Sequence, residues 1–218
     1  MRYIALVDMN AYFASCMQQA FRNLRCKPVG VSRKPLDKTI IASASYEAKE
    51  FGIKNGMATW VAKEMCPKLI IVPGDPWMFA YSSSRIYGIL KEFSPLVEVF
   101  SIDEAWVDIT QVSQQIGSPV KTAYAIKQRI KKELGPFYRC SIGIASTKTM
   151  SKIAAEKKKP DGLIWIKDEE FPYWLNRLEV DAACGIAGAT KEKLNSMGIK
   201  TLAELGKLIC PGSGLPLE

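Results

Sequence analysis

The sequence has 218 residues, 48% of them hydrophobic, and a net charge of +8, so it can bury a core and suits either a polyanionic partner or an ordinary basic protein. It contains no histidine, which excludes serine-histidine triads, cysteine-histidine pairs and imidazole metal ligands. No apolar run approaches the roughly 20 residues of a membrane span, and six scattered cysteines without a C-x-x-C spacing predict reduced thiols in a cytoplasmic protein.

The first half of the chain predicts a strand that ends at an acid, followed by helices and short strands. Residues 3–7 form an apolar run, which predicts a buried strand ending at Asp8. Asn10 can cap a helix over residues 11–22, where apolar residues recur at helical spacing. The elements predicted next are a strand at 27–31, a charged turn at 33–38, a returning strand at 39–42, a short helix at 46–51 stopped by Gly52, and a helix from Asp75-Pro76 to about Phe93.

An acidic turn between two strands marks the second half. Asp103 and Glu104 separate a predicted strand at 96–101 from another at 105–109. The elements predicted after it are a helix from Pro119 to about Leu134, a strand at 139–144, a helix opened by Thr147, a turn at 160–162, a strand at 163–166, a small helical unit from about Asp168 and a Pro/Gly-rich tail at 210–218. This order predicts an α+β fold, a sheet with helices on one face, interrupted by an insertion at 11–72.

Three acids, Asp8, Asp103 and Glu104, are the first candidates for chemistry. Neighbours on a regular strand point to opposite faces, so Asp103 and Glu104 can share one site only at a turn. Carboxylates at the ends of apolar strands repel one another, and a magnesium ion would relieve this repulsion. Three converging carboxylates suit two-metal phosphoryl transfer, whereas an isolated Asp-Glu pair is more often a solvated turn. We expect Asp108, on the outgoing strand, to be solvated.

Four segments in order, at residues 7–15, 46–49, 101–105 and 153–162, resemble the motifs of Y-family translesion DNA polymerases (the ImpB/MucB/SamB family), and their UmuC and DinB branches in particular. The resemblance covers about residues 2–208. It implies a palm with a mixed or antiparallel sheet at 1–10 and 74–166, a small α/β fingers insertion at 11–73, and a small helical thumb, similar to a helix-hairpin-helix, at 167–218. The family's little finger domain has no counterpart here, so we expect a catalytic-core fragment.

The resemblance also implies roles for individual residues. Asp8, Asp103, Glu104 and the backbone carbonyl of Met9 would hold two Mg²⁺ ions. Phe13 would be the steric gate that excludes ribonucleotides, with Tyr12 in the core. The residues implied to bind the nucleotide are Ser43, Tyr46, Lys49 and Lys159, where Lys49 replaces the arginine of most members and gives a point charge instead of a bidentate fork.

The thumb segment departs from the family pattern at one position. The family turn Gly-Ile-Gly becomes Gly185-Ile186-Ala187-Gly188, and the Cβ of Ala187 opposes a positive φ unless Gly188 shifts the turn by one residue. Gly185, Gly188 and Lys191 are the residues that the resemblance implies for DNA binding.

The resemblance implies a template-directed DNA polymerase that adds dNTPs to a primer 3′ end during lesion bypass in the SOS response to DNA damage. Its implied partners are primer-template DNA, dNTP and a sliding clamp bound through a missing C-terminal region. One alternative is a DNA- or nucleotide-binding fragment with little or no polymerase activity by itself. Another is a palm-type nucleotide cyclase, against which Phe13, the Tyr46 motif and the thumb segment argue.

Overall fold

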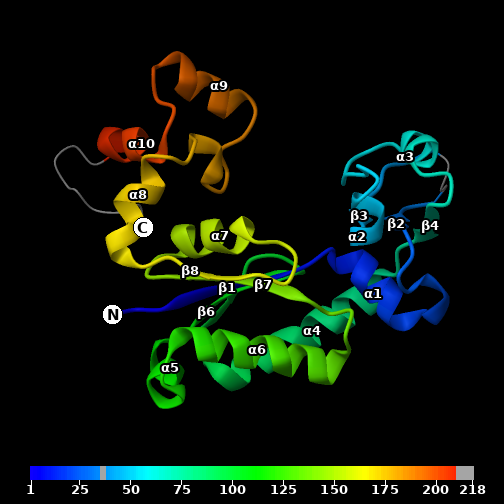
Figure 1. The fold of residues 1–218 in the computed structure, drawn as a ribbon, viewed down its shortest axis with the longest axis horizontal. Helices are drawn as coiled ribbons and strands as arrows, with labels where there is room; N and C mark the ends of the chain where they lie inside the picture. Colours follow the sequence, from blue (N-terminus) through cyan, green and yellow to red (C-terminus); the bar gives the residue numbers. More distant parts are fainter. Residues whose placement is uncertain (35–37, 210–218) are drawn as a thin grey trace. The chain divides into compact units, whose positions relative to one another are not determined.

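The computed structural model describes residues 1–34 and 38–209, which form two compact units (Figure 1). The first unit consists of Met1–Val7, Trp106–Ala123 and the described residues from Ser141 onward. The second consists of Asp8–Ala105 and Tyr124–Cys140. No helix among the described residues is long and apolar enough to cross a membrane.

The larger sheet has five strands in the order β5-β6-β1-β7-β8. β7 and β8 are parallel, with Ile142 opposite Leu163 and Ile144 opposite Trp165. Every residue of β1 and β7 is buried, as expected of near-continuous apolar strands in the middle of a sheet. The mixed sheet with its helices confirms the α+β class. The strands are β1 (Ile4–Met9), β5 (Val97–Val99), β6 (Glu104–Asp108), β7 (Cys140–Ala145) and β8 (Leu163–Trp165).

In the first unit, α7 (Lys148–Lys157) packs closely on β7. The side chain of Thr147 caps it by accepting a hydrogen bond from the Met150 amide at 3.3 Å. A Cβ on Gly143 would lie 2.0 Å from the Ser151 carbonyl oxygen, so only glycine permits this approach. Ala155 on α7 completes a small apolar cluster with residues of β1 and β6, namely Ile4, Leu6 and Trp106.

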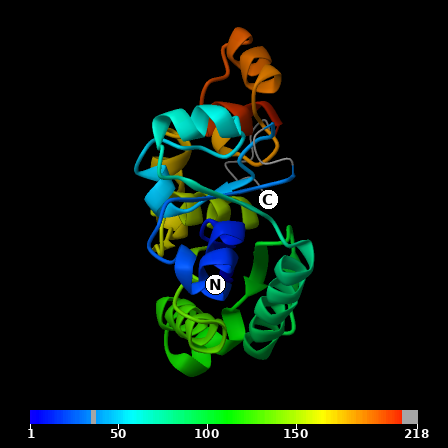
Figure 2. The ribbon, with the colours of Figure 1, turned by 90° about the vertical axis from the view of Figure 1, so that its right-hand side faces the viewer.

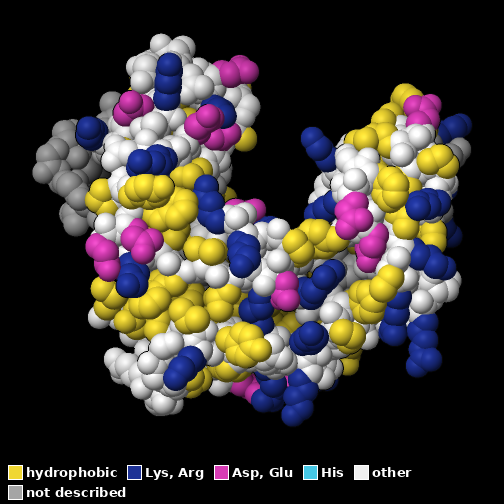
Figure 3. Space-filling model, viewed as in Figure 1, with side chains coloured by type: hydrophobic (Ala, Val, Ile, Leu, Met, Phe, Trp, Pro, Cys, Tyr) yellow, Lys and Arg dark blue, Asp and Glu magenta, His cyan; other side chains and the backbone are white. Residues whose placement is uncertain are grey.

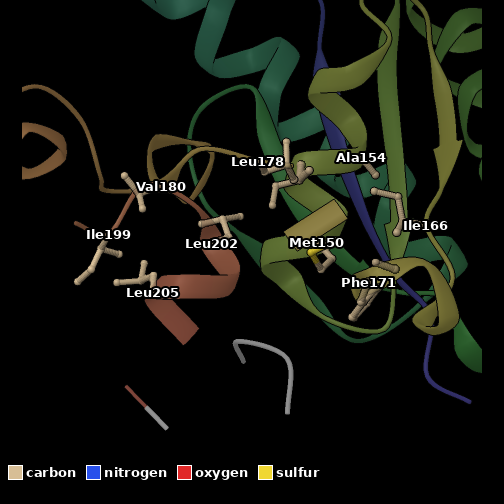
Figure 4. Packing of buried hydrophobic residues seen from close by; sticks show 11 residues of the cluster. Met150, Ala154, Ile166, Phe171, Leu178, Val180, Ile199, Leu202 and Leu205 are labelled. Carbon is tan, nitrogen blue, oxygen red and sulfur yellow. The ribbon is translucent and has the colours of Figure 1, made fainter. Parts of the chain in front are cut away.

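The C-terminal part of the first unit is helical, as predicted. Figure 4 shows buried residues from α7 to α10 that belong to one apolar cluster, with Met150, Phe171 and Leu202 among its members. Its elements are η2 (Asp168–Glu170), α8 (Phe171–Leu175), η3 (Val180–Ala182), α9 (Ala189–Ser196) and α10 (Leu202–Ile209). The remaining helix of this unit is α5 (Thr110–Ile116).

The second unit contains a smaller sheet of order β3-β2-β4, visible from two directions in Figures 1 and 2. β2 (Val29–Ser32) pairs antiparallel with β3 (Ser43–Ala44) and parallel with β4 (Ile70–Pro73). With α2 (Tyr46–Lys49) and α3 (Thr59–Met65), these strands enclose a core. The core residues are Ile41, Ala44, Ala48, Ile53, Ala62, Cys66 and Leu69.

Two long helices begin and end where the sequence predicts. α4 spans Pro76–Phe93, and the Asp75 side chain caps it by accepting hydrogen bonds from the amides of Trp77 and Met78, both at 3.1 Å. α6 spans Pro119–Leu134. The other helical elements of this part are α1 (Tyr12–Ala20) and η1 (Arg22–Leu24).

Several local predictions were wrong. Asn10 does not cap α1: Ala11 holds the cap position with a φ of 46° and no side-chain bond. The returning strand lies at β3, two residues beyond the predicted 39–42, and Ile40 makes only an isolated bridge to Ala58. The helices α3 and α5 and the strand β4 were missed. The predicted turn at 33–38 and tail at 210–218 fall partly or wholly outside the described residues, and the three-domain division stays a prediction.

Candidate metal and nucleotide site

The end of β1 and the acidic turn lie beside each other in the second unit. The amide of Met9 donates a hydrogen bond to the carbonyl oxygen of Asp103 at 2.9 Å. Asp8, the residue before it, is only 8% exposed, although it carries a carboxylate. Glu104 begins β6 directly after the turn. A backbone contact thus joins two acidic segments that lie far apart in the sequence.

The turn itself is closed by short-range hydrogen bonds. The carbonyl oxygen of Glu104 accepts bonds from the amides of Phe100 and Ser101, each at 3.1 Å. The Ser101 hydroxyl donates to Oδ1 of Asp103 at 2.5 Å, which fixes the orientation of that carboxylate. Asp103 and Glu104 therefore sit where one strand turns into the next, as their shared site requires.

Tyr87, on α4, stands behind the acidic turn. Its hydroxyl donates a hydrogen bond to the carbonyl oxygen of Ser101. Burial and then the negative charges of Asp103 and Glu104 raise the pKa of Tyr87, so its phenol stays neutral beside the acids. Neither Tyr87 nor Ser101 was identified from the sequence as a residue supporting these carboxylates. Only their spacing to the turn, invisible without the fold, could have indicated it.

The donor set suits a hard cation, but the carboxylates do not form a finished cage. Within residues 1–34 and 38–209, no three His, Cys, Asp or Glu side chains are grouped closely enough to hold a metal ion. The candidate donors, the carboxylates of Asp8, Asp103 and Glu104 and the carbonyl of Met9, are all oxygen atoms, which magnesium prefers. They fit the ion in chemistry, and binding would have to draw the side chains together.

Tyr12 and Phe13 take different positions at the start of α1. Tyr12 is buried at 3% exposure, in the core as expected, and its hydroxyl donates a hydrogen bond to the Phe79 carbonyl oxygen at 2.6 Å. Burial raises the pKa of Tyr12. Phe13 is half-buried, and its ring stacks on that of Phe79. The neighbour of Asp8 on this helix that reaches the surface is therefore an aromatic ring backed by a second ring.

Tyr46 lies between two cations. The ammonium of Lys49 is 4.7 Å from the centroid of its ring, and the guanidinium of Arg139 is 5.6 Å from it. The amide of Asn10 donates to the carbonyl oxygen of Arg139 at 2.8 Å, which ties this cation to the segment that follows Asp8. Arg139 was treated in the sequence only as the start of a strand, and no sequence signal set it apart.

Ser43 is buried, and its hydroxyl accepts a hydrogen bond from the Ala14 amide at 3.4 Å, so it supports α1. Ser45, two residues on, caps α2 by accepting a bond from the Ala48 amide at 3.3 Å. The structure thus brings Asp8, Asp103, Glu104, Met9, Phe13, Ser43, Tyr46 and Lys49 into one unit.

The remaining predicted site residues lie in the first unit. The ammonium of Lys159 pairs with Oε1 of Glu156 at 2.9 Å. Gly185 and Gly188 both have positive φ, 89° and 47°, whereas Ala187 does not, so the two glycines provide the left-handed positions of this turn.

Lys191, on α9, pairs with two acids. Its ammonium lies 2.5 Å from Oε2 of Glu179 and 2.7 Å from Oδ2 of Asp181. Charge–charge contacts of this kind raise the pKa of Lys191 and keep it protonated. A phosphate would have to compete with both carboxylates for this lysine.

Known proteins resemble the chain over nearly its whole length. Residues 7–156 match the family described as impB/mucB/samB. DNA polymerase IV of Clostridium kluyveri is 40% identical over 207 residues, covering 94% of this chain and 51% of the relative. DNA polymerase IV of Bacillus velezensis is 39% identical over 207 residues, covering 94% and 49%. The chain spans about half the length of the curated relatives it matches.

Solved structures show the same fold. The insertion ternary complex of Dbh DNA polymerase superposes with a TM-score of 0.84 at 31% identity, covering 94% of this chain and 63% of that one. The crystal structure of DinB from Sulfolobus solfataricus gives a TM-score of 0.79 at 30% identity, covering 95% and 63%.

Proposed function

Because the chain belongs to the impB/mucB/samB family, we propose that it is the core of a template-directed DNA polymerase of the translesion type, which extends a primer 3′ end with dNTPs. The observation that carries the proposal is the hydrogen bond from Met9 to Asp103, which joins the Asp8 strand to the Asp103-Glu104 turn. Two further features support it: an aromatic ring beside these acids and a phenol flanked by two cations.

The acids would hold the catalytic cations. In this proposal Asp8, Asp103, Glu104 and the Met9 carbonyl bind two Mg²⁺ ions. When bound, such ions lower the pKa of the primer hydroxyl and neutralise the triphosphate. The chain's own contribution is orientation: the Ser101 hydroxyl holds the Asp103 carboxylate, and the backbone bond at Met9 holds the strand end beside the turn.

Five side chains would receive the nucleotide. Tyr46 donates a hydrogen bond to a phosphate oxygen, while Lys49 and Arg139 neutralise the phosphate charge. Lys159 adds a further cation from the end of the α7 segment. Phe13 fills the space that a 2′ hydroxyl would need, and Ser43 supports the helix that carries this ring.

The same proposal extends to partners. Primer-template DNA would contact the turn at Gly185 and Gly188 and the ammonium of Lys191, which would exchange its two carboxylates for a phosphate. Lesion bypass during the SOS response, a cytoplasmic location and contact with a sliding clamp through a region beyond this chain are part of the proposal. The alternative is a fragment that binds DNA or nucleotide but hardly polymerises.

Primer extension with magnesium tests the proposal. The wild-type chain and the Asp103→Ala variant are compared on a labelled primer-template, with DNA binding measured in parallel. We expect extension by the wild type and none by the variant, with binding kept. Binding without extension in both would favour the binding fragment, and equal extension rates in both would reject the assignment of Asp103.

A further inference from the structure

A cavity lies away from the acids, between α3 and β4 in the second unit. Its volume is about 700 Å³, within the usual range of binding cavities. It is lined by Thr59, Trp60 and Lys63 of α3 and by the segment from Lys68 to Ile71. In Figure 3, hydrophobic and basic side chains lie next to one another on the surface around α3.

Trp60 gives this cavity an unusual wall. Its side chain is 61% exposed, although a tryptophan of the core would be largely covered. Ile70 and Ile71 are only half-buried and add further apolar surface. A large aromatic side chain beside a hollow is typical of the anchor positions that carry most of the energy of a protein interface.

The charges at the cavity have one sign. Lys63 and Lys68 are its charged lining residues, and no aspartate or glutamate lines it. The Lys68 ammonium lies 5.1 Å from the centroid of the Phe51 ring, which holds it at the rim. Glu64, on the same helix, is not part of the lining. An acidic occupant would therefore be complementary.

The backbone of β4 adds a direction. β4 is at the edge of the three-stranded sheet, next to β2. The amides of Ile70 and Gly74 donate to β2, to the carbonyls of Pro28 and Ser32 at 2.9 and 3.0 Å. Alternation along a parallel strand then turns the N–H and C=O of Ile71 away from β2. Pro73, the next outward position, has no N–H, so the edge offers one short stretch for pairing.

We propose that the cavity between α3 and β4 docks a short, extended, acidic segment of a partner protein. One apolar side chain of that segment packs against Trp60, its acids pair with Lys63 and Lys68, and its backbone bonds to Ile71. Peptides that add along a sheet edge take their affinity from main-chain bonds and their specificity from such side-chain contacts. Single-stranded nucleic acid would also meet an aromatic ring and lysines, but it makes no use of the strand edge.

Selection from a library of short random peptides, with the whole chain as bait, tests this. We expect the recovered peptides to interleave acidic and apolar residues. Binding of a synthetic copy should weaken at least about tenfold in Trp60→Ala and in Lys63→Glu with Lys68→Glu. Lys54→Glu, which changes an exposed lysine of the same unit outside the cavity, should leave it unchanged. Methylating the peptide nitrogen that faces Ile71 should also weaken it.

Three results would overturn the proposal. One is recovery of no peptide above the level seen with the Trp60→Ala bait, provided thermal melting shows that both baits are folded. Another is an affinity that the charge reversals do not change. The third is displacement of the bound peptide by a single-stranded oligo-dT, with oligo-dT binding itself lost in Trp60→Ala, which would assign the surface to nucleic acid.

Discussion

The rings of Phe13 and Phe79 stack, with centroids 4.5 Å apart and planes inclined by 26°. The backbone of Phe79 is itself held, because its carbonyl oxygen accepts the hydrogen bond from the buried Tyr12 hydroxyl. Stacking of this kind is worth about 0.5–1.5 kcal/mol beyond the area it buries. The proposed sugar-contacting ring is thus backed by a second aromatic ring and cannot retreat easily when a larger sugar presses on it.

Replacing Phe13 by alanine is expected to admit ribonucleotides. Loss of the ring opens space at the sugar edge, so the ratio of dNTP to rNTP incorporation efficiency should fall at least about tenfold. The measurement is steady-state kcat/KM for matched dNTP and rNTP. Phe21→Ala, which changes an exposed phenylalanine near the end of α1, serves as the control. A ratio that stays unchanged in Phe13→Ala would leave that ring with a packing role only.

Magnesium should stabilise the wild-type chain through Asp103. An ion that binds only the folded state adds about 2.7 kcal/mol to the free energy of unfolding at about 100 times its Kd. In Asp103→Asn we expect most of this increase to disappear, since one charged ligand is gone. Thermal melts with and without magnesium measure it, independently of catalysis. Asp168→Asn is the control, and an equal magnesium shift in Asp103→Asn would remove Asp103 from the ligands.

Arg139 is expected to contribute to dNTP affinity. Its guanidinium stands across the Tyr46 ring from Lys49, and a planar fork can bind a phosphate by two bonds where lysine offers a point charge. Arg139→Gln should raise the KM for dNTP about tenfold with a smaller change in kcat. Arg22→Gln, at an exposed arginine, should change neither. An unaltered KM in Arg139→Gln would confine Arg139 to a structural contact.

Strong local signals account for what could be predicted from the sequence. α4 begins at Pro76 because Asp75 is a cap and Pro76 suits a first turn, and both features are readable without the fold. The acidic turn was predictable because Asp103 and Glu104 interrupt two apolar runs. Where the signal was short or atypical it failed: the four residues of β4 lie in an apolar stretch too brief to assign.

Long-range contacts explain the rest. Ala11 adopts a left-handed conformation at the start of α1, which no alanine predicts. Arg139 joins the Tyr46 site through folding of the chain, since 93 positions separate 46 from 139. The supporting contacts of Tyr87 likewise exist only once α4 is packed behind the turn. Sequence patterns could therefore supply the acids and the family motifs, but not their neighbours.

Asp108 should make stability depend on pH. Burial alone would raise its pKa, but hydrogen bonds from Thr110 and the charge of Arg2 outweigh burial, so the pKa of Asp108 lies below its ordinary value. A depressed folded-state pKa contributes stability above the unfolded-state pKa, near 4, and this contribution is lost as pH falls through the lower folded-state value. Asp108→Asn should therefore destabilise the chain by about 1 kcal/mol at neutral pH.

The difference between Asp108→Asn and the wild type should shrink once pH falls below about 4. Urea denaturation at several pH values measures it, and Asp168→Asn controls for loss of an exposed carboxylate. The exposed Arg2 pair is expected to contribute less than the Thr110 hydrogen bond, because its guanidinium lies largely in water. A difference that does not vary with pH would contradict the proposed linkage.

Gly188→Ala is expected to weaken binding of primer-template DNA. Gly188 precedes α9 with φ 47° and ψ −120°, a conformation that costs a residue with a Cβ about 1–3 kcal/mol. Space is not the obstacle, since a Cβ there would meet nothing within 4 Å. The strain should therefore rearrange the turn and misplace the amides that the proposal aims at a DNA phosphate. Each lost phosphate contact should also reduce the slope of log affinity against log salt by about one unit. DNA titrations at several salt concentrations measure both effects. Gly206→Ala, in α10, has equally open space and an ordinary φ, and should leave affinity and slope unchanged. If Gly188→Ala binds DNA as the wild type does while its melting temperature falls, the turn serves the fold and the DNA contact lies elsewhere.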